Sequence, residues 1–278
     1  METSIQYTDV KEYGMITPQN LIVDAPKVTL QVTEFIRSQI EKSGLKGAIV
    51  SLSGGIDSSL VLALTVEALG PERVTGVTMP ERDVTPESDI TDVMKLCATY
   101  DVTCDTVEIT QILRVMRESL PLHDPEDRIP LGNLKARTRM VVAYHYANSL
   151  GRMVMGSSNK TELLTGYFTK YGDGGVDLMP IAGLYKTQVR QLSRSLRLPE
   201  SIISKPPSAG LWPGQTDEGE LGITYELLDL VLYGMEMGME SPEIARDLKV
   251  EGGLVEMVLN RVRSTEHKRR LPLILRLS

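Results

Sequence analysis

Cysteine, tryptophan and phenylalanine are scarce in this chain, which contains two, one and two of them among 278 residues. The spacing of Cys97 and Cys104 matches no zinc-binding signature, so we expect both to be small buried apolar residues. No apolar run approaches the about 18 residues that a transmembrane helix needs, and the N-terminus lacks a signal-peptide pattern. These absences predict a cytoplasmic protein without a membrane segment.

Positive charge is also in deficit. Lysine and arginine total 30 against 37 acidic residues, which gives a formal net charge of −7. A surface of this sign does not attract nucleic acid, so we expect no nucleic-acid partner, although local basic sites remain open. The length and the 41% of apolar residues suit a globular protein with ample core.

The most informative stretch is a turn rich in glycine and serine. Residues 47–50 are apolar and end in β-branched side chains, which predicts a buried strand, and residues 60–69 predict a largely buried helix. The turn between them reads Ser51-Leu52-Ser53-Gly54-Gly55-Ile56-Asp57-Ser58-Ser59. Its glycines leave room for an incoming group, and the free N–H groups of the helix start suit phosphate. The turn therefore predicts a phosphate site.

Asp57 distinguishes this turn from the commonest phosphate loop, which has a lysine at the helix start. A carboxylate beside phosphates is repulsive unless a cation lies between them, so Asp57 indicates Mg²⁺. The alternative is an ordinary turn in which Asp57 caps the helix.

Strands and helices alternate over the first two thirds of the chain. Further strands are expected at residues 73–79, 105–109 and 152–156, and helices at 26–43, 86–100, 110–120, 132–150 and 187–196. This alternation predicts an α/β fold with a doubly wound, mostly parallel sheet and helices on both faces. Ligands of such sheets bind beyond the carboxyl ends of the strands, so Met79, Ser157 and the glycine-rich turn should share one crevice.

The pattern changes beyond residue 165. Residues 166–183 predict a functional loop, and residues 206–222 a lid that orders when substrate binds. Short helices at 225–235, 242–248 and 254–262 predict a helical C-terminal region. We expect one domain, 1–278, made of a peripheral segment (1–25), a nucleotide-binding core (27–200), and a lid loop with a helical tail (201–278).

A second strand-to-helix turn carries Ser157 and Ser158, with Glu162 one helical turn further on. Glu162 could complete an Mg²⁺ site with Asp57 and phosphate oxygens. It could equally be the second member of a capping box whose cap is Ser158 or Asn159.

Two basic runs stand out. Residues 133–140 place Lys135, Arg137 and Arg139 near a predicted helix start, where the helix dipole disfavours cations. A bound anion would offset this, and a solvated basic face is the alternative. Residues 265–270 taken alone predict a disordered basic tail, although an anionic ligand bound across a subunit boundary would give them a role.

The motifs resemble those of a known family. Residues 53–58 resemble the SGGxDS pyrophosphate-binding loop of the PP-loop ATP pyrophosphatases, which cleave ATP to AMP and pyrophosphate. From about residue 25 onward the chain resembles the ammonia-dependent NAD synthetases within that superfamily. The motifs that carry this resemblance are Asn133–Met140, Thr165–Asp173, Pro206–Ala209, Gln215–Glu218 and Glu266–Lys268. The fold implied is like that of the adenine nucleotide alpha hydrolases.

The resemblance implies a C–N ligase that amidates deamido-NAD with ammonia through an adenylated carboxylate, giving NAD, AMP and pyrophosphate as the last step of NAD biosynthesis. No glutaminase-like domain is attached, so ammonia would be free or delivered by a separate protein. A homodimer is also implied. ATP would be bound by Ser51, Leu52, Ser53, Gly54, Gly55, Ile56, Asp57, Ser58, Ser157, Lys186 and Ser208, Mg²⁺ by Asp57 and Glu162, and deamido-NAD by Arg137, Lys170, Asp177, His267 and Lys268.

Two residues are candidates for catalysis. Lys186 would stabilise charge on the departing pyrophosphate. Ammonia is mostly ammonium at neutral pH, so we expect Asp173, on the loop after Lys170, to attract and deprotonate it.

Two rival readings remain. The first rival is another PP-loop ligase or a transfer-RNA thiolase. A thiolase would normally show reactive cysteine pairs and a basic surface, and this chain shows neither. A non-catalytic nucleotide-binding protein is disfavoured by the combination of Asp57, Glu162 and Lys186.

Overall fold

The computed structural model describes residues 15–122, 124 and 126–275. Its sheet has four strands in the order β3-β2-β1-β4, and every neighbouring pair is parallel. The strands are β1 (Ala48–Leu52), β2 (Val74–Thr78), β3 (Thr103–Thr106) and β4 (Met153–Met155). In the register, Val50 of β1 lies between Gly76 and Met155. The expected α/β fold with a parallel sheet is confirmed.

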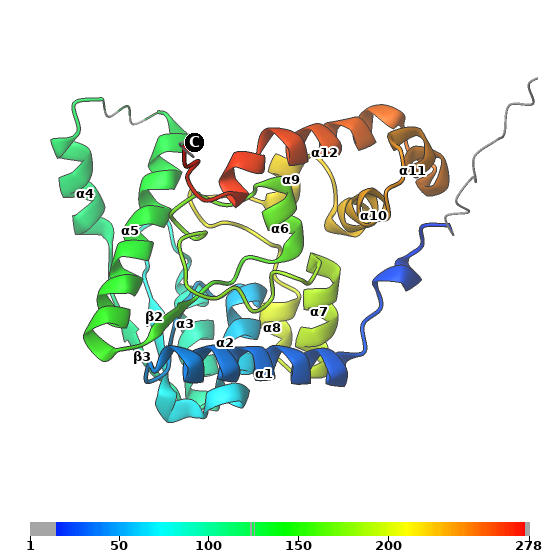
Figure 1. The fold of residues 1–278 in the computed structure, drawn as a ribbon. Coiled ribbons are helices and arrows are strands. Elements are labelled where there is room, and N and C mark those ends of the chain that lie inside the picture. The colour runs from blue at the N-terminus through cyan, green and yellow to red at the C-terminus, as the bar shows by residue number, and fades with distance from the viewer. Residues whose placement is uncertain (1–14, 123, 125, 276–278) are drawn as a thin grey trace, which may run out of the picture.

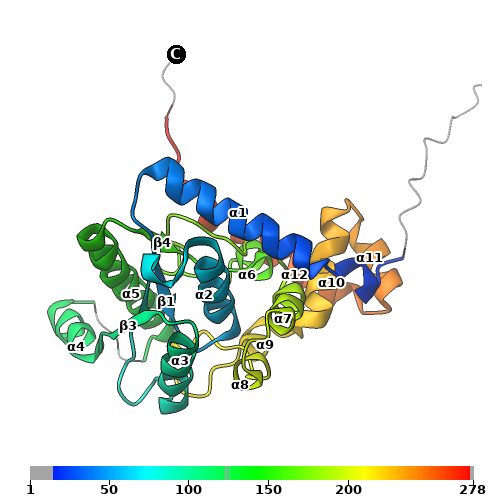
Figure 2. The same cartoon turned by 90° about the horizontal axis from the view of Figure 1, so that it is seen from below.

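Alternate side chains of β1 pack on opposite faces of the sheet. Ala48, Val50 and Leu52 join one apolar cluster, and Ile49 joins another. Both faces are therefore covered, as the views in Figures 1 and 2 show. The first face carries α1 (Ala25–Ser43), α2 (Ile56–Leu69), α3 (Glu87–Thr99), α7 (Lys186–Ser195) and α8 (Glu200–Ile203), and the second carries α4 (Thr110–Ser119) and α5 (Arg128–Leu150).

The sheet order places a topological switch point at the carboxyl end of β1. The chain leaves β1 toward β2 on one side, and β4 later pairs with the other side. A crevice opens where neighbouring connections diverge in this way. The glycine-rich turn after β1 and the turn after β4 both lie at this point.

The C-terminal helices have an apolar core of their own. The helices are α9 (Asp217–Leu221), α10 (Tyr225–Glu236), α11 (Ser241–Leu248) and α12 (Gly252–Ser264), followed by a 3₁₀ helix, Glu266–Arg269. Ile16 and Leu21, the second of which ends the 3₁₀ turn Pro18–Leu21, are buried in this core. Residues 1–14 of the expected peripheral segment lie outside the described residues.

Three expectations about the elements need correction. The third strand is Thr103–Thr106 rather than 105–109, because this edge strand is polar and partly exposed and so lacks an apolar signal. The long helix α5 begins at Arg128, four residues before Gly132, since Pro130 is tolerated in a first helical turn. The expected lid contains the short helix α9, and the short helix α8 was missed, whereas α6 (Lys160–Thr165) follows the turn at Ser157 and Ser158 as predicted.

Among the described residues, none of the helices combines the length and the hydropathy that crossing a bilayer requires.

Candidate active site

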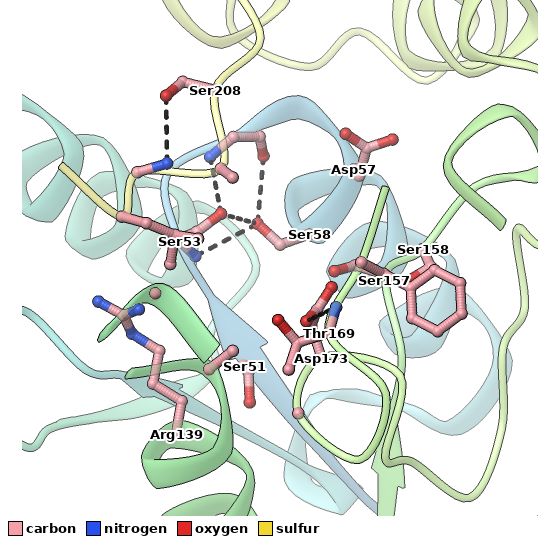
Figure 3. Close-up of a pocket in the computed structure, with 18 of the residues that line it drawn as sticks. Ser51, Ser53, Asp57, Ser58, Arg139, Ser157, Ser158, Thr169, Asp173 and Ser208 are labelled. Atoms are coloured by element: carbon pink, nitrogen blue, oxygen red, sulfur yellow. Dashed lines mark hydrogen bonds between the residues drawn. The ribbon is translucent and has the colours of Figure 1, made fainter. Parts of the chain in front are cut away.

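A cavity of about 910 Å³ opens at the switch point. Its walls come from the turns after β1 and β4, from α5, and from residues 206–215 (Figure 3). The crevice expected from the sheet topology is thus present. The predicted site residues that line it are Ser51, Leu52, Ser53, Gly55, Ile56, Asp57, Ser58, Ser157, Glu162, Asp173, Lys186, Ser208 and Lys268.

Hydroxyl groups and a positive φ angle shape the glycine-rich turn. Gly54 has φ +78°, and its carbonyl accepts a hydrogen bond of 3.2 Å from Lys205 Nζ. The Ser58 hydroxyl lies 3.2 Å from that of Ser53 and donates to the Gly55 carbonyl (Figure 3). Gly55 N-caps α2 in an extended conformation without a side-chain cap. The turn therefore presents hydroxyls and helix-start amides to the cavity.

Gly54→Ala should lower the free energy of unfolding by about 1–2 kcal/mol, because φ is left-handed there. A Cβ would also lie 2.9 Å from Asp89 Cβ and from the Asp89 carbonyl oxygen, so the turn should shift and bind ATP about tenfold more weakly. Urea unfolding and calorimetric ATP titration measure the two effects. Gly183→Ala is the matched control, since no atom approaches its Cβ position within 4 Å. Equal behaviour of the two variants would contradict this account.

Asp57, Glu162 and Lys186 meet at the floor of the cavity. Lys186 Nζ lies 2.5 Å from Asp57 Oδ2 and 3.3 Å from Glu162 Oε1, and the lysine side chain is only 2% exposed. Each residue comes from the first turn of a different helix, namely α2, α6 and α7. All three are predicted site residues, and the structure brings them together.

Of the two alternatives for Glu162, the structure shows the capping box. Asn159 caps α6 and forms a reciprocal capping box with Glu162. Its amide also donates to Asp57 Oδ1 at 2.9 Å. The capping box therefore fixes the Glu162 carboxylate beside Asp57, and the Mg²⁺ role of Glu162 stays a prediction that this arrangement does not contradict.

Burial governs the protonation of this cluster. Desolvation raises the pKa of Glu162 to about 8, and the neighbouring Asp57 carboxylate adds to the rise although Lys186 opposes it. Desolvation lowers the pKa of Lys186, but the carboxylates of Asp57 and Glu162 more than reverse this, so its net pKa is raised. Lys186 is therefore an ammonium at neutral pH.

The donor set of the cluster fits Mg²⁺ in part. The carboxylates of Asp57 and Glu162 already converge on one cation, the Lys186 ammonium. Within the part of the chain that the structure describes, no group of three or more His, Cys, Asp or Glu side chains could hold a metal. Two carboxylates with substrate phosphates and water are the usual Mg²⁺ environment, so the remaining ligands would come from ATP.

Asp229 is a buried residue that sequence reasoning missed. It is fully buried on α10, where it accepts hydrogen bonds from the Thr161 hydroxyl at 2.5 Å and the Thr187 amide at 2.8 Å. The Thr161 hydroxyl in turn accepts the Lys186 amide. Asp229 therefore positions the start of α7. The sequence signal that could have identified it is an acidic residue within the apolar run 227–232.

Asp173 lines the cavity, and its side chain is exposed there. Its Oδ1 accepts the Thr169 amide at 2.8 Å. Partial desolvation by the cavity walls raises the pKa of Asp173, while the Thr169 amide and the cations Lys268 and Arg139 oppose the rise. The geometry leaves the carboxylate available to a small cation in the cavity.

The residues predicted to bind the dinucleotide divide into two groups. Lys268 lines the cavity, and its ammonium donates to the Gly166 and Phe168 carbonyls. Arg137 instead donates to the Lys170 carbonyl, and Lys170 donates to the His267 carbonyl, so these three residues form one chain of contacts away from the cavity lining.

Asp177 lies outside the cavity lining as well. Its carboxylate accepts the Val154 amide at 2.8 Å and the Tyr144 hydroxyl at 3.0 Å. In this structure Asp177 therefore supports the edge strand β4.

The basic C-terminal run is ordered, contrary to the expectation of a disordered tail. Arg269, in the 3₁₀ helix Glu266–Arg269, donates to the Val262 carbonyl at 2.6 Å and the Leu164 carbonyl at 2.7 Å. These carbonyls belong to the last turns of α12 and α6 and lack partners within their helices. Arg269 thus ties the ends of two helices together, a long-range role that charge patterning does not show.

Known proteins share this chain's sequence and fold. The sequence profile of the NAD synthase family matches residues 28–272. A protein from Methanosarcina acetivorans named NH(3)-dependent NAD(+) synthetase is 49% identical over 250 residues, which cover 90% of this chain and 98% of that protein. A protein of the same name from Staphylothermus marinus is 44% identical over 260 residues, 93% of this chain and 94% of that protein.

Two solved structures agree with this one. NMN synthetase from Francisella tularensis has a TM-score of 0.81 at 30% identity and covers 92% of this chain and 100% of its own. NH3-dependent NAD synthetase from Campylobacter jejuni has a TM-score of 0.78 at 31% identity, with 91% and 100% covered.

Proposed function

This chain belongs to the NAD synthase family, and from that premise we propose that it is a ligase that amidates deamido-NAD with ammonia. The reaction consumes ATP and releases NAD, AMP and pyrophosphate, the last step of NAD biosynthesis. The observation that carries the proposal is the meeting of Asp57, Glu162 and Lys186 beside the glycine-rich turn. A module that only bound nucleotide would not need a buried ammonium between two carboxylates in its cavity.

The chemistry proceeds in two steps. A nicotinate carboxylate oxygen attacks the α-phosphorus of ATP, and pyrophosphate leaves. Ammonia then attacks the carbonyl carbon of the acyl adenylate, and AMP leaves.

The protein contributes positioning and charge. Amides and hydroxyls of the glycine-rich turn hold the phosphates, and the Lys186 ammonium stabilises negative charge on the departing pyrophosphate. Asp57 and Glu162 would hold Mg²⁺, which when bound neutralises phosphate charge. The hydrogen bond from the Asn159 side chain to Asp57 and the capping box with Glu162 keep both carboxylates oriented.

Asp173 serves the second step by attracting ammonium and accepting its proton. Asp173→Asn should raise the KM for ammonia about 10²-fold and leave pyrophosphate release in the absence of ammonia little changed. Initial rates over a range of ammonium chloride concentrations, with a pyrophosphate assay, separate the two effects. An unchanged ammonia dependence of turnover would rule this role out.

The deamidated dinucleotide is proposed to lie near Lys268 and the contact chain of Arg137, Lys170 and His267. A homodimer would bring a second chain to this region. Exposed apolar side chains on α4, α5 and the intervening segment support an interface there, namely Ile112, Val115, Met116, Leu120, Leu122 and Ile129. Light scattering of the purified protein at micromolar concentration measures the mass directly.

One assay separates the proposal from its rivals. The protein is incubated with ATP, Mg²⁺, ammonium and deamido-NAD, and NAD and pyrophosphate are quantified together. Equimolar NAD and pyrophosphate are expected. Bound nucleotide without turnover would favour a binding module. Preference for the deamidated mononucleotide over deamido-NAD would instead align the chain with the Francisella tularensis protein.

A further inference from the structure

Lys135 does not line the cavity, although its neighbours on α5 do. Gly132, Asn133 and Ala136 all face the cavity, whereas Lys135 is turned away from it and is only 6% exposed. Burying an ammonium is costly unless partners compensate for its lost hydration. The partners of Lys135 therefore indicate what it does.

Lys135 joins two segments that are far apart in sequence. Its Nζ lies 2.6 Å from Glu81 Oε2 and donates a hydrogen bond of 2.6 Å to the Leu211 carbonyl. Glu81 is 5% exposed and is also paired with Arg117, at 3.1 Å from its other oxygen. One ammonium thus connects the segment after β2 to residues 206–215.

Residues 206–215, which form the upper wall of the cavity, make few other polar contacts with the rest of the protein. Over the ranges that the structure describes, Lys135 donates the one hydrogen bond that joins them to a residue outside 205–221. Leu211 and Trp212 rest on α5 at Gly132, where a Cβ would lie 3.0 Å from Leu211 Cδ1 and 3.6 Å from the Trp212 ring. Apart from Lys205 at its start, whose ammonium contacts the Gly54 carbonyl, Asp89 and Asp92, the polar attachment of this wall to residues outside 205–221 depends on Lys135.

We propose that Lys135 is a positioning residue that fastens residues 206–215 over the cavity, with Glu81 holding its ammonium in place. Glu81 follows Pro80, and Pro80, Val84 and Thr85 line the facing wall, so the two walls share one buried cation. The two alternatives from the sequence were that Lys135 binds an anion or lies on a solvated basic face, and the proposed role differs from both. The choice of ATP as the ligand in the test rests on the proposed function, but the fastening itself does not.

Trp212 is the single tryptophan of the chain, so its fluorescence reports on this wall. Lys135→Met keeps the length of the side chain and removes both bonds. We expect acrylamide to quench Trp212 about twofold more strongly in this variant, and ATP to bind about tenfold more weakly, because fewer molecules hold the wall closed. Lys135→Arg should restore both quantities in large part, since a guanidinium can reach Glu81 and a carbonyl.

Arg117→Met is the matched control. It removes the other cation from Glu81 without touching residues 206–215, so Trp212 quenching and ATP affinity should stay near those of the parent protein. Glu81→Gln is a second, nearly isosteric variant that decides the matter if Lys135→Met does not fold, and it should also increase quenching.

The proposal would be overturned if Trp212 were quenched equally in folded Lys135→Met and in the parent protein. If Lys135→Met does not fold, the same comparison is made with Glu81→Gln. An equal increase in Arg117→Met would overturn it too, because the effect would then be one of general destabilisation. Neither outcome depends on turnover. A chain that made no NAD would contradict the proposed function and leave the fluorescence result to decide this inference.

Discussion

Asp57→Ala is expected to lower the rate of pyrophosphate release from ATP and deamido-NAD by about 10³-fold, because it removes one of two carboxylates that would hold Mg²⁺ at the phosphates. The loss should appear in the adenylation step, before ammonia is needed. A pyrophosphate assay without ammonia therefore measures it directly. Asp57→Ala also removes the acceptor of the Asn159 amide, so circular dichroism must confirm that α2 and α6 remain formed.

Glu67→Ala is the matched control for this experiment. Glu67 is an exposed acid on the same helix, α2, and its loss removes one carboxylate from that helix but none from the cavity. Its rate should stay within about twofold of the parent protein, as for most surface substitutions. Release of pyrophosphate by Asp57→Ala at a similar rate would refute the proposed role of Asp57.

Lys186→Met should be the most damaging substitution for stability within the site. It leaves the Asp57 and Glu162 carboxylates facing each other without their shared cation, which should lower the free energy of unfolding by about 3 kcal/mol. Adenylation should fall by about 10²–10³-fold, because a positive charge at the departing pyrophosphate is lost. Urea unfolding and the pyrophosphate assay measure the two losses separately.

A double variant tests whether the stability loss arises from the unpaired carboxylates. Adding Asp57→Asn to Lys186→Met removes one of them, so part of the lost stability should return while activity stays low. Lys160→Met breaks the more exposed ion pair with Glu236 and should cost no more than about 1 kcal/mol. Simple additivity of the Asp57→Asn and Lys186→Met effects would mean that the three charges do not interact as the distances indicate.

Local chemistry made much of the site predictable. The glycine-rich turn has a strong signature, because a strand, two glycines, hydroxyls and a helix follow one another within a short stretch. The rule that parallel strands present their carboxyl ends at one edge then placed Ser157 in the same crevice. The capping-box spacing was enough to predict that Glu162 lies one turn into α6.

Long-range contacts explain what the sequence did not reveal. Lys135 and Arg269 belong to basic runs, but each is paired with groups distant in sequence, Glu81 and Leu211 in one case and helix carbonyls in the other. Charge patterning treats such runs as solvated because it cannot see these partners. The polar edge strand β3 was predicted two residues too late, at 105–109, for a different reason, since an exposed edge has no apolar alternation that would indicate its bounds.

The hydrogen bonds of Asp229 have a consequence for the order in which the protein becomes competent during synthesis. Lys186 lies at a helix start where an acid 43 positions further along the chain accepts the Thr187 amide and the Thr161 hydroxyl, and that hydroxyl accepts the Lys186 amide. A nascent polypeptide that has emerged from the ribosome only as far as α7 already has the whole sheet and the glycine-rich turn. The Lys186 ammonium should nevertheless not be correctly positioned until α10 has been synthesised and has packed against α7. We therefore expect the chain to become catalytically competent only after its nucleotide-binding half has folded.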